Sequence, residues 1–466
     1  MIFADTLPKI KTFLRPASLS ATTSLLLIRL LIAFLHHPGR MSASQAAKAI
    51  RSQGRHRAQL ARFLARLHWS KDWAVLNAVA ALVLEAEAQR QGNWVFILDQ
   101  TYCGQQGQKT ENTFSCGNRT RRPKKGRRYQ KRKCAKRSCH GFVLGLLLTP
   151  SGLRIPSCRC YYTQDYCQAK HHAYKKQPEL AARYVYKKQP ELAAELIAVL
   201  GVPSGVRVVV LGDTAFEAKV IRAACAARNF IWIVPINPER VLAGAAPRPK
   251  VRSLSHGLTA EDFEAVRLVP GTGAYAAQRR ASRCRVGRKA KARTFWVHPE
   301  RRAVHNVGDV LLVFSTKEQP QVGQTVSVQK VLISNGVGLS AAEVVELYDL
   351  RWQIELFFKE LKSTLGFAQY RFRRFAAVEG WAQVCLVTFC YLEWQRARQL
   401  KRPELPEKEK GWWCWQRSFG LGQAITEHAQ GQDLVRLFRW SGTKAGLKRL
   451  RQTLRLAQPL EYRKSE

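Results

Sequence analysis

The strongest constraint on the fold is a pair of short β-forming runs, each followed at once by an aspartate. The runs are "NWVFILDQT", which reaches Asp99, and "VRVVVLGDTAF", which reaches Asp213. A helical segment, "EAKVIRAACAARN", and another apolar run, "FIWIVPI", follow the second aspartate. This order is typical of a β-α-β unit and predicts parallel strands flanked by helices.

Between the two aspartates the sequence predicts an antiparallel hairpin and a duplicated segment. The runs "HGFVLGLLLTP" and "GLRIPSCRCYYT" are separated by the turn signal "PSG", so they are expected to pair. The fold class is therefore α/β with a mixed sheet. Two consecutive copies of "YKKQPELAA", starting at Tyr174 and Tyr186, are expected to lengthen a helix-loop segment, and no chemistry is assigned to them.

The net charge narrows the class of partner. The chain has 77 Lys and Arg against 33 Asp and Glu, a formal charge of +44. Such a field attracts polyanions, and phosphate contacts release counterions, so double-stranded DNA is the expected partner. An anionic membrane or a ribosome is the alternative. The apolar run Leu25–Leu35 has 11 residues, short of the about 20 that span a membrane, so no membrane partner is expected.

Composition divides the chain into five regions. An N-terminal helical region contains a weak helix-turn-helix pattern, "SASQAAKAIRSQGRHRAQLARFL", which predicts DNA binding, with an ordinary helical bundle as the alternative. Ser42 or Ser44 could cap its first helix, and Ser340 is expected to cap the helix that contains Glu355. The predicted regions are 1–90 (helical, DNA-binding), 91–236 (strands and helices), 237–332 (β-rich insertion), 333–400 (helices with Glu355) and 401–466 (helical tail).

The segment "YDLRWQIELFFKELK" places four polar side chains at helical spacing. At about 100° per residue, Tyr348, Arg351, Glu355 and Lys362 lie in one stripe of about 60°, with Lys359 beside it. Apolar residues cover a separate face. A glutamate between cations stays ionised, although the same spacing also suits a ladder of ion pairs on an exposed face.

A carboxylate at the end of a buried strand is costly unless a partner compensates it, and a bound cation would do so. Asp99, Asp213 and Glu355 form an oxygen-rich set suited to Mg²⁺, or Mn²⁺. Two such ions about 3.5–4 Å apart can clamp both oxygens of a phosphoryl transfer. Three other acids lie at competing positions in the sequence: Asp165, Glu217 and Glu346.

The spacing Tyr348-x2-Arg351-x3-Glu355-x6-Lys362 resembles the Y-R-E-K signature of bacterial cut-and-paste DDE transposases of the insertion sequence four family. "ILDQT" and "LGDTAF" resemble the two aspartate blocks of that family, and "RWQIELFFKELKSTLG" resembles its glutamate block. The aspartates are 114 residues apart, and Glu355 follows Asp213 by 142 residues. The long second gap matches the β-rich insertion of the family.

The resemblance implies an RNase H-like catalytic core, interrupted by the insertion, with Asp99, Asp213 and Glu355 as catalytic residues that bind two metal ions. It implies cleavage at the ends of a DNA element, attack by the freed 3′ hydroxyl through a hairpin, and strand transfer into target DNA. It also implies a homodimer that pairs two ends. Tyr348, Arg351 and Lys362 would contact phosphates near the element end.

A basic run, "RTRRPKKGRRYQKRKCAKR", is expected to face DNA near the site. It spans Arg119–Arg137 with 12 Lys and Arg and no acid; a disordered basic loop that orders on binding is the alternative. Together with the cations of the glutamate segment, the DNA-binding candidates are Tyr348, Arg351, Lys359, Lys362, Arg119, Arg121, Arg122, Lys124 and Lys125.

Tryptophan and cysteine give weaker signals. Trp232 and Trp296 are candidates for stacking on a flipped base, although a core position is favoured for both. Cysteines and histidines between Cys134 and His172 do not repeat the usual zinc spacing. Twelve cysteines in 466 residues fit reduced thiols, and we expect a cytoplasmic, nucleoid-associated bacterial protein.

Two other functions remain open from the sequence. One is an RNase H-like nuclease or resolvase that cuts without strand transfer. The other is a non-catalytic DNA-binding protein derived from a transposase. All three carboxylates are present, which favours a competent enzyme.

Overall fold

A computed structural model describes residues 6–37, 40–49, 56–66, 71–105, 110–116, 137–244, 248–269, 272–280 and 292–400. Within these residues the chain forms one mixed sheet flanked by helices, as predicted, an architecture compatible with an RNase H-like transposase fold. The strands are β1 (Trp94–Gln105), β2 (Phe114–Cys116), β3 (Arg137–Leu148), β4 (Arg154–Tyr161), β5 (Val208–Leu211), β6 (Ile231–Pro235), β7 (Glu264–Leu268), β8 (Arg293–Val304), β9 (Gly308–Thr316) and β10 (Lys330–Ser334).

The sheet has the order β2-β3-β1-β5-β6-β10-β9-β8-β7, and β4 pairs with β3. Strands β1, β5 and β6 are parallel neighbours, and β5 and β6 are joined by a helix, as predicted for the β-α-β unit. All four residues of β5 are buried, which is why this strand is a continuous apolar run. The predicted β3–β4 hairpin is also confirmed, with Leu148 opposite Arg154.

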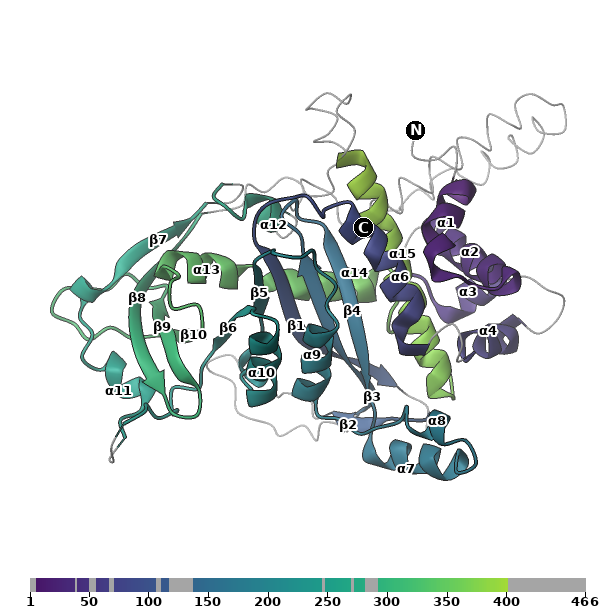
Figure 1. Ribbon diagram of the computed structural model, residues 1–466, viewed down its shortest axis with the longest axis horizontal. Helices are drawn as coiled ribbons and strands as arrows, with labels where there is room; N and C mark the ends of the chain where they lie inside the picture. Colours follow the sequence, from purple (N-terminus) through teal and green to yellow (C-terminus); the bar gives the residue numbers. More distant parts are fainter. Residues whose placement is uncertain are drawn as a thin grey trace, which may run out of the picture.

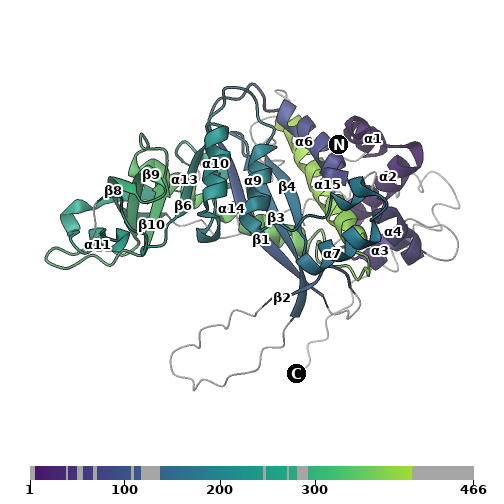
Figure 2. The same ribbon diagram turned by 60° about the horizontal axis from the view of Figure 1, so that its bottom comes forward.

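Helices cover both faces of the sheet and build the end of the molecule that lies opposite β7, β8 and β9 (Figures 1 and 2). Helices α9 and α10 lie on one face, and α14 crosses the other (Figure 1). Their bounds are α1 (Thr6–Leu14), α2 (Ala21–His36), α3 (Ala43–Ala49), α4 (His56–Leu64), α6 (Ala74–Glu85), α7 (Gln164–Ala173), α8 (Pro178–Ala181), α9 (Gln189–Ala198), α10 (Lys219–Ala227), α11 (Val251–Ser255), α12 (Ala276–Arg280), α13 (Ala341–Asp349), α14 (Trp352–Ser363) and α15 (Phe375–Leu400), with short 3-10 helices η1 (Arg15–Ala17), η2 (Lys71–Trp73), η3 (Thr214–Phe216) and η4 (Ala260–Asp262).

The N-terminal helices dock on α15 through close backbone contacts. Gly380 of α15 packs directly against the carbonyl of Leu64, and Gly366, with φ +66°, packs against the carbonyl of Met41. Ser42 caps α3, because its hydroxyl accepts from Gln45 N at 3.3 Å. The predicted turn between α3 and α4 lies outside the described residues.

Helix α15 is the single described segment long and apolar enough to cross a membrane. However, 89% of its apolar window is buried inside the protein. It serves here as the central packing element between the N-terminal helices and the sheet, contacting α6, α4 and β4.

Two expectations about local structure are wrong. β1 does not end at Asp99 but continues to Gln105, because β3 goes on pairing with it after β5 has ended. The segment from Ser340 to Ser363 is two helices rather than one: the chain turns at Leu350 and Arg351 with i to i−3 backbone hydrogen bonds. Ser340 does cap the first of them, accepting from Glu343 N at 3.1 Å.

Within the predicted β-rich insertion, β7, β8 and β9 extend the core sheet through β10 rather than forming a separate sheet. The C-terminal segment 401–466 lies outside the described residues.

The cysteines depart from the expected reduced state at one pair. Cys116 of β2 and Cys139 of β3 form a disulfide, while the other described cysteines are free and buried.

Candidate active site

Asp99 and Asp213 lie side by side because of the register of two parallel strands. Ile97 of β1 pairs with Leu211 of β5, the last pair that the strands share. Each aspartate follows two residues later, Asp99 still within β1 and Asp213 just beyond the end of β5, and the two carboxyl groups are close enough for Asp213 to repel Asp99. Asp213 also caps η3, accepting a hydrogen bond from Ala215 N at 2.9 Å.

Glu355 approaches the two aspartates from α14, which packs on β1. Its side chain is 34% exposed and lies in the first turn of the helix. Repulsion from Asp213 and from Glu355 acts on the carboxyl group of Asp99. All three carboxyl groups are therefore within electrostatic reach around Asp99.

The Arg351 guanidinium lies between two of these carboxylates. Nη2 donates to Glu355 Oε1 at 2.5 Å, and Nη1 is 3.7 Å from Asp99 Oδ2. The ion pair with Glu355 has the i, i+4 spacing that the sequence allowed as an alternative. It faces an aspartate rather than open solvent, since only 18% of the Arg351 side chain is exposed.

The pKa of Asp99 is raised to about 6, and burial is the main cause. The backbone N–H of Gln100 donates to Oδ1 at 2.7 Å and lowers the pKa in part. Repulsion from Asp213 raises it further, Arg351 lowers it, and Glu355 raises it again. The site thus carries more negative charge than its arginine balances, which favours binding of an additional cation.

Tyr348 and Lys330 add a donor and a positive charge beside Arg351. Burial raises the pKa of Tyr348 to about 12, so the phenol stays neutral. Lys330 Nζ lies 5.0 Å from the centre of the Tyr348 ring. Burial, followed by repulsion from Arg351 and Lys317, lowers the pKa of Lys330. Sequence analysis missed Lys330, because it begins an ordinary strand at the end of the insertion and no motif surrounds it.

The remaining cations of the glutamate segment lie further along α14. Lys362 Nζ donates to the carbonyl of Tyr102 at 3.1 Å, three residues beyond Asp99 on β1. Lys359 is exposed. Lys362 therefore lies beside β1, beyond Asp99 along the strand.

The donor set fits a hard divalent cation by residue type. Carboxylate oxygens are the ligands that Mg²⁺ and Mn²⁺ prefer, and the excess negative charge around Asp99 is consistent with that use. As the side chains stand, no three acidic, histidine or cysteine residues in the described part of the chain lie close enough together to hold an ion. Arg351 instead contacts Glu355 and lies near Asp99.

The three competing acids have other partners or other surroundings. Glu217 is buried between Arg222 at 2.5 Å and Arg240 at 2.6 Å. Glu346 pairs with Arg279 at 3.4 Å. Asp165 lies exposed in the first turn of α7.

A buried ion network holds α14 against the sheet and α15. Arg154 of β4 donates from Nη1 to Glu360 of α14 at 2.9 Å and from Nε to Glu393 of α15 at 3.0 Å. Arg396 donates to the other oxygen of Glu393 at 3.0 Å. Glu360 is five residues from Glu355, so this network fixes the helix that positions the glutamate.

The weaker candidates have different outcomes. Trp232 is buried in the core at 4% exposure, as favoured, and Trp296 is partly buried against the core. Cys139 is in the disulfide, and both ring nitrogens of His140 have partners, the Tyr370 hydroxyl and the Glu111 carbonyl. The basic-run candidates lie outside the described residues: Arg119, Arg121, Arg122, Lys124 and Lys125.

Comparison with known proteins gives one family match. Residues 186–392 match the family model of the transposase DDE domain. The matched region contains Asp213 and Glu355 and begins after Asp99. A search of curated proteins gives no significant match. The match therefore shows that residues 186–392, somewhat less than half of the chain, are similar to a transposase DDE domain.

Proposed function

We propose that this chain is a cut-and-paste transposase of the insertion sequence four type, which cleaves the ends of its DNA element and joins them to target DNA. The observation that carries the proposal is that Asp99 of β1 and Asp213, just beyond the neighbouring β5, each follow the last residue pair of these strands by two residues, with Glu355 joined to Asp99 through Arg351. This arrangement gathers carboxylates from three distant parts of the chain beside a group of cations.

In the proposed reaction, water attacks the phosphorus at the element end, and the 3′ oxygen leaves and takes a proton. The freed 3′ hydroxyl then attacks phosphorus on the opposite strand, forming a hairpin and releasing the strand it replaces. A second water opens the hairpin and regenerates the 3′ hydroxyl, which attacks phosphorus in target DNA and exchanges one phosphodiester bond for another. Two Mg²⁺ or Mn²⁺ ions held by Asp99, Asp213 and Glu355 would supply charge stabilisation for the attacking and leaving oxygens.

The cations of the site have a positioning role in this proposal. Arg351 is the group best placed to exchange its carboxylate partner for a phosphate of the scissile strand, since a guanidinium binds both bidentately. Lys330 and the neutral hydroxyl of Tyr348 flank it. Lys362, which donates to a carbonyl of β1, would contact the DNA strand where it continues along β1.

A strand-transfer assay tests the proposal. A duplex with a pre-cleaved 3′ end, carrying the DNA that borders the reading frame, is incubated with plasmid and Mg²⁺ or Mn²⁺. Products that join the duplex to plasmid support a transposase. Cleavage of an uncut end without joined products would instead indicate a nuclease or resolvase.

One observation favours a second candidate, a non-catalytic DNA-binding protein. Among the described residues no group of three potential ligands is preformed, and Glu355 is paired with Arg351. Binding of the end duplex with no cleavage in either ion would support this candidate over the enzyme.

A further inference from the structure

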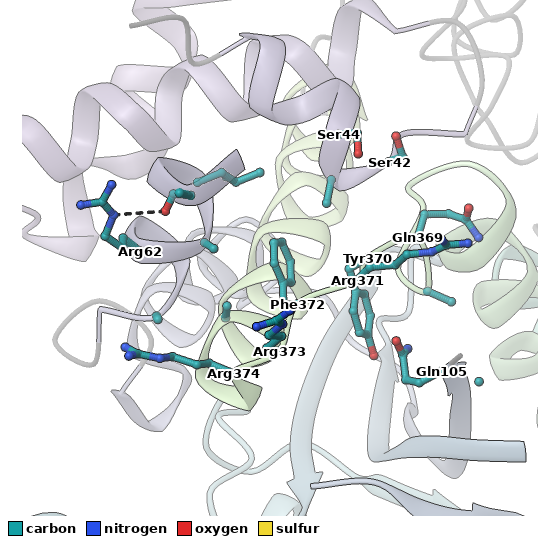
Figure 3. A pocket seen from close by; sticks show the side chains of 18 residues that line it. Ser42, Ser44, Arg62, Gln105, Gln369, Tyr370, Arg371, Phe372, Arg373 and Arg374 are labelled. Atoms are coloured by element: carbon teal, nitrogen blue, oxygen red, sulfur yellow. Dashed lines mark hydrogen bonds between the residues drawn. The ribbon is translucent and has the colours of Figure 1, made fainter. Parts of the chain in front are cut away.

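We infer that a cavity between the N-terminal helices and the segment after α14 seats one sugar–phosphate strand of duplex DNA. This inference rests on the proposed function for its partner and adds a second contact surface to it. The cavity has a volume of about 750 Å³. Figure 3 shows it between Ser42, Ser44 and Arg62 on one side and residues 369–374 on the other.

The residues that line the cavity are basic in composition. Among its 18 residues are four arginines and no aspartate or glutamate: Arg62, Arg371, Arg373 and Arg374. The last three are exposed. Serine and glutamine side chains make up most of the remaining polar lining. Arginines with neutral hydrogen-bonding neighbours are the residues that hold a phosphate backbone without reading its sequence.

Aromatic side chains anchor residues 369–374, which we call the arginine segment. Tyr370 and Phe372 alternate with the arginines, and the centres of their two rings lie 6.1 Å apart. The Tyr370 hydroxyl is hydrogen-bonded to His140 Nδ1 at 3.0 Å. The backbone is fixed as well, because Arg373 O accepts from Glu111 N at 2.9 Å. The arginines therefore project from a rigid support, which reduces the entropy lost on binding.

The opposite wall of the cavity, formed by the N-terminal helices, is held at a fixed distance from the arginine segment. Ala43 N donates to Gln369 O at 2.9 Å, directly joining α3 to the arginine segment. The close contacts of Gly366 and Gly380 with the backbone of the N-terminal helices fix the same joint. The cavity is thus a permanent feature between two docked parts of the molecule.

The cavity is also in line with the active site. Gly104 and Gln105 at the end of β1 form its floor. Gly104 is five residues beyond Asp99, or about 17 Å along the strand, which equals about five base pairs of duplex. Lys362 lies between the two places. One duplex can therefore contact both, with the cavity holding a backbone segment about five base pairs from the scissile phosphate.

Salt dependence of binding tests this inference apart from catalysis. All proteins carry Asp213→Asn, so no cleavage is needed and a failure of the proposed reaction leaves the test intact. Binding of a fluorescent 40-base-pair duplex is followed by anisotropy between about 50 and 200 mM KCl. The test variant is Arg373→Gln/Arg374→Gln; the matched control is Arg301→Gln/Arg302→Gln, another exposed arginine pair, on β8 at the opposite end of the molecule (Figure 1).

Two lost phosphate contacts lower the slope of log K against log salt by about 1.8 in the test variant, with unchanged melting temperature. The control slope is expected to change by less than about 0.5. Equal slopes for test and parent, or equal losses in test and control, would overturn the inference.

A second measurement locates the DNA. A photocrosslinking residue in place of Ser44, on the wall opposite the arginines, should crosslink to the duplex, whereas one in place of Arg301 should not. Failure of the Ser44 position to crosslink, while the duplex is bound, would overturn the inference.

Discussion

Arg351 controls the charge balance of the candidate site when no ion or DNA is bound. Its guanidinium donates a hydrogen bond to the Glu355 carboxylate at 2.5 Å and lies 3.7 Å from the Asp99 carboxylate. This positive charge allows the two carboxylates to remain near each other. Under the proposed function, the same contact would compete with a divalent cation, and a phosphate of the DNA would offer the arginine another partner.

Removal of this competitor should strengthen ion binding in the absence of DNA. For Arg351→Ala we expect Mn²⁺ affinity, measured by electron paramagnetic resonance, to rise about tenfold, equivalent to one ion pair of about 1.4 kcal/mol. Lys359→Ala, which also removes a cation from α14, is the control and should change affinity less than twofold. Weaker Mn²⁺ binding by Arg351→Ala would show that the arginine supports the site instead.

The raised pKa of Asp99 predicts a pH-dependent stability. Its folded pKa of about 6 exceeds the unfolded value of about 3.9, so the folded state holds the proton more tightly. Stability from this group is full below about pH 4 and is lost as pH rises through 6. Asp99→Asn should therefore raise the free energy of unfolding by up to about 3 kcal/mol at pH 7.5, with little effect at pH 4.

Urea unfolding at the two pH values, without divalent ions, measures this difference. The exposed Asp309→Asn on β9 is the control and should stay within about 0.5 kcal/mol of the parent at both. Equal destabilisation of Asp99→Asn at pH 4 and pH 7.5 would contradict the predicted charge environment.

At the scale of elements, the buried network around Arg154 fixes the glutamate helix. Arg154→Ala would remove the buried cation that joins Glu360 to Glu393 and leave Glu393 with Arg396, and we expect a loss of about 3–5 kcal/mol in the free energy of unfolding. Arg159→Ala, on the same strand but in a more exposed pair with Glu195, should cost no more than about 1 kcal/mol. Chemical denaturation of both variants measures the contrast; similar small losses would mean that the network does not hold α14.

Elements were predictable where the local pattern agrees with the packing. The apolar run before Asp213 correctly predicted the strand β5, and the turn signal that ends at Gly152 correctly predicted the β3–β4 hairpin. The duplicated segment shows the limit: the same "YKKQPELAA" forms the four-residue α8 in its first copy and the ten-residue α9 in its second. The second copy continues into Leu196 and Ile197, which are buried, so residues beyond the repeat decide the length.

The candidate site was predictable in its residues but not in its arrangement. The Y-R-E-K spacing singled out Arg351 and Glu355. However, this spacing fits one continuous helix, so it did not predict the turn at Leu350 that separates α13 from α14. Spacing also could not show that Arg351 contacts Asp99, because that contact depends on the packing of α14 on β1. Lys330 reaches the candidate site only because of the position of its strand in the sheet. No local sequence pattern encodes that position.

At the scale of the whole molecule, the N-terminal helices and the catalytic core act as one docked unit. The contact of Gly380 with Leu64 leaves no space for a side chain, so Gly380→Ala must push the two parts apart. We expect a loss of about 1–3 kcal/mol and faster hydrogen exchange in α4. Gly338→Ala, where a methyl group meets open space, should leave both unchanged; normal exchange in α4 of Gly380→Ala would contradict this docking.

At the same scale, the proposed function requires the three carboxylates to converge on divalent ions. The decisive measurement is cleavage, in Mg²⁺ or Mn²⁺, of duplex DNA carrying the borders of the reading frame. The native chain is compared with Asp99→Asn, Asp213→Asn and Glu355→Gln, and with Glu346→Gln as a carboxyl control on the neighbouring helix. Ion-dependent cleavage by the native chain and the control, with at least about a thousandfold loss in each of the other three variants, is the predicted result. Native-rate cleavage by any one of those three variants, or no cleavage by the native chain in either ion, would contradict it.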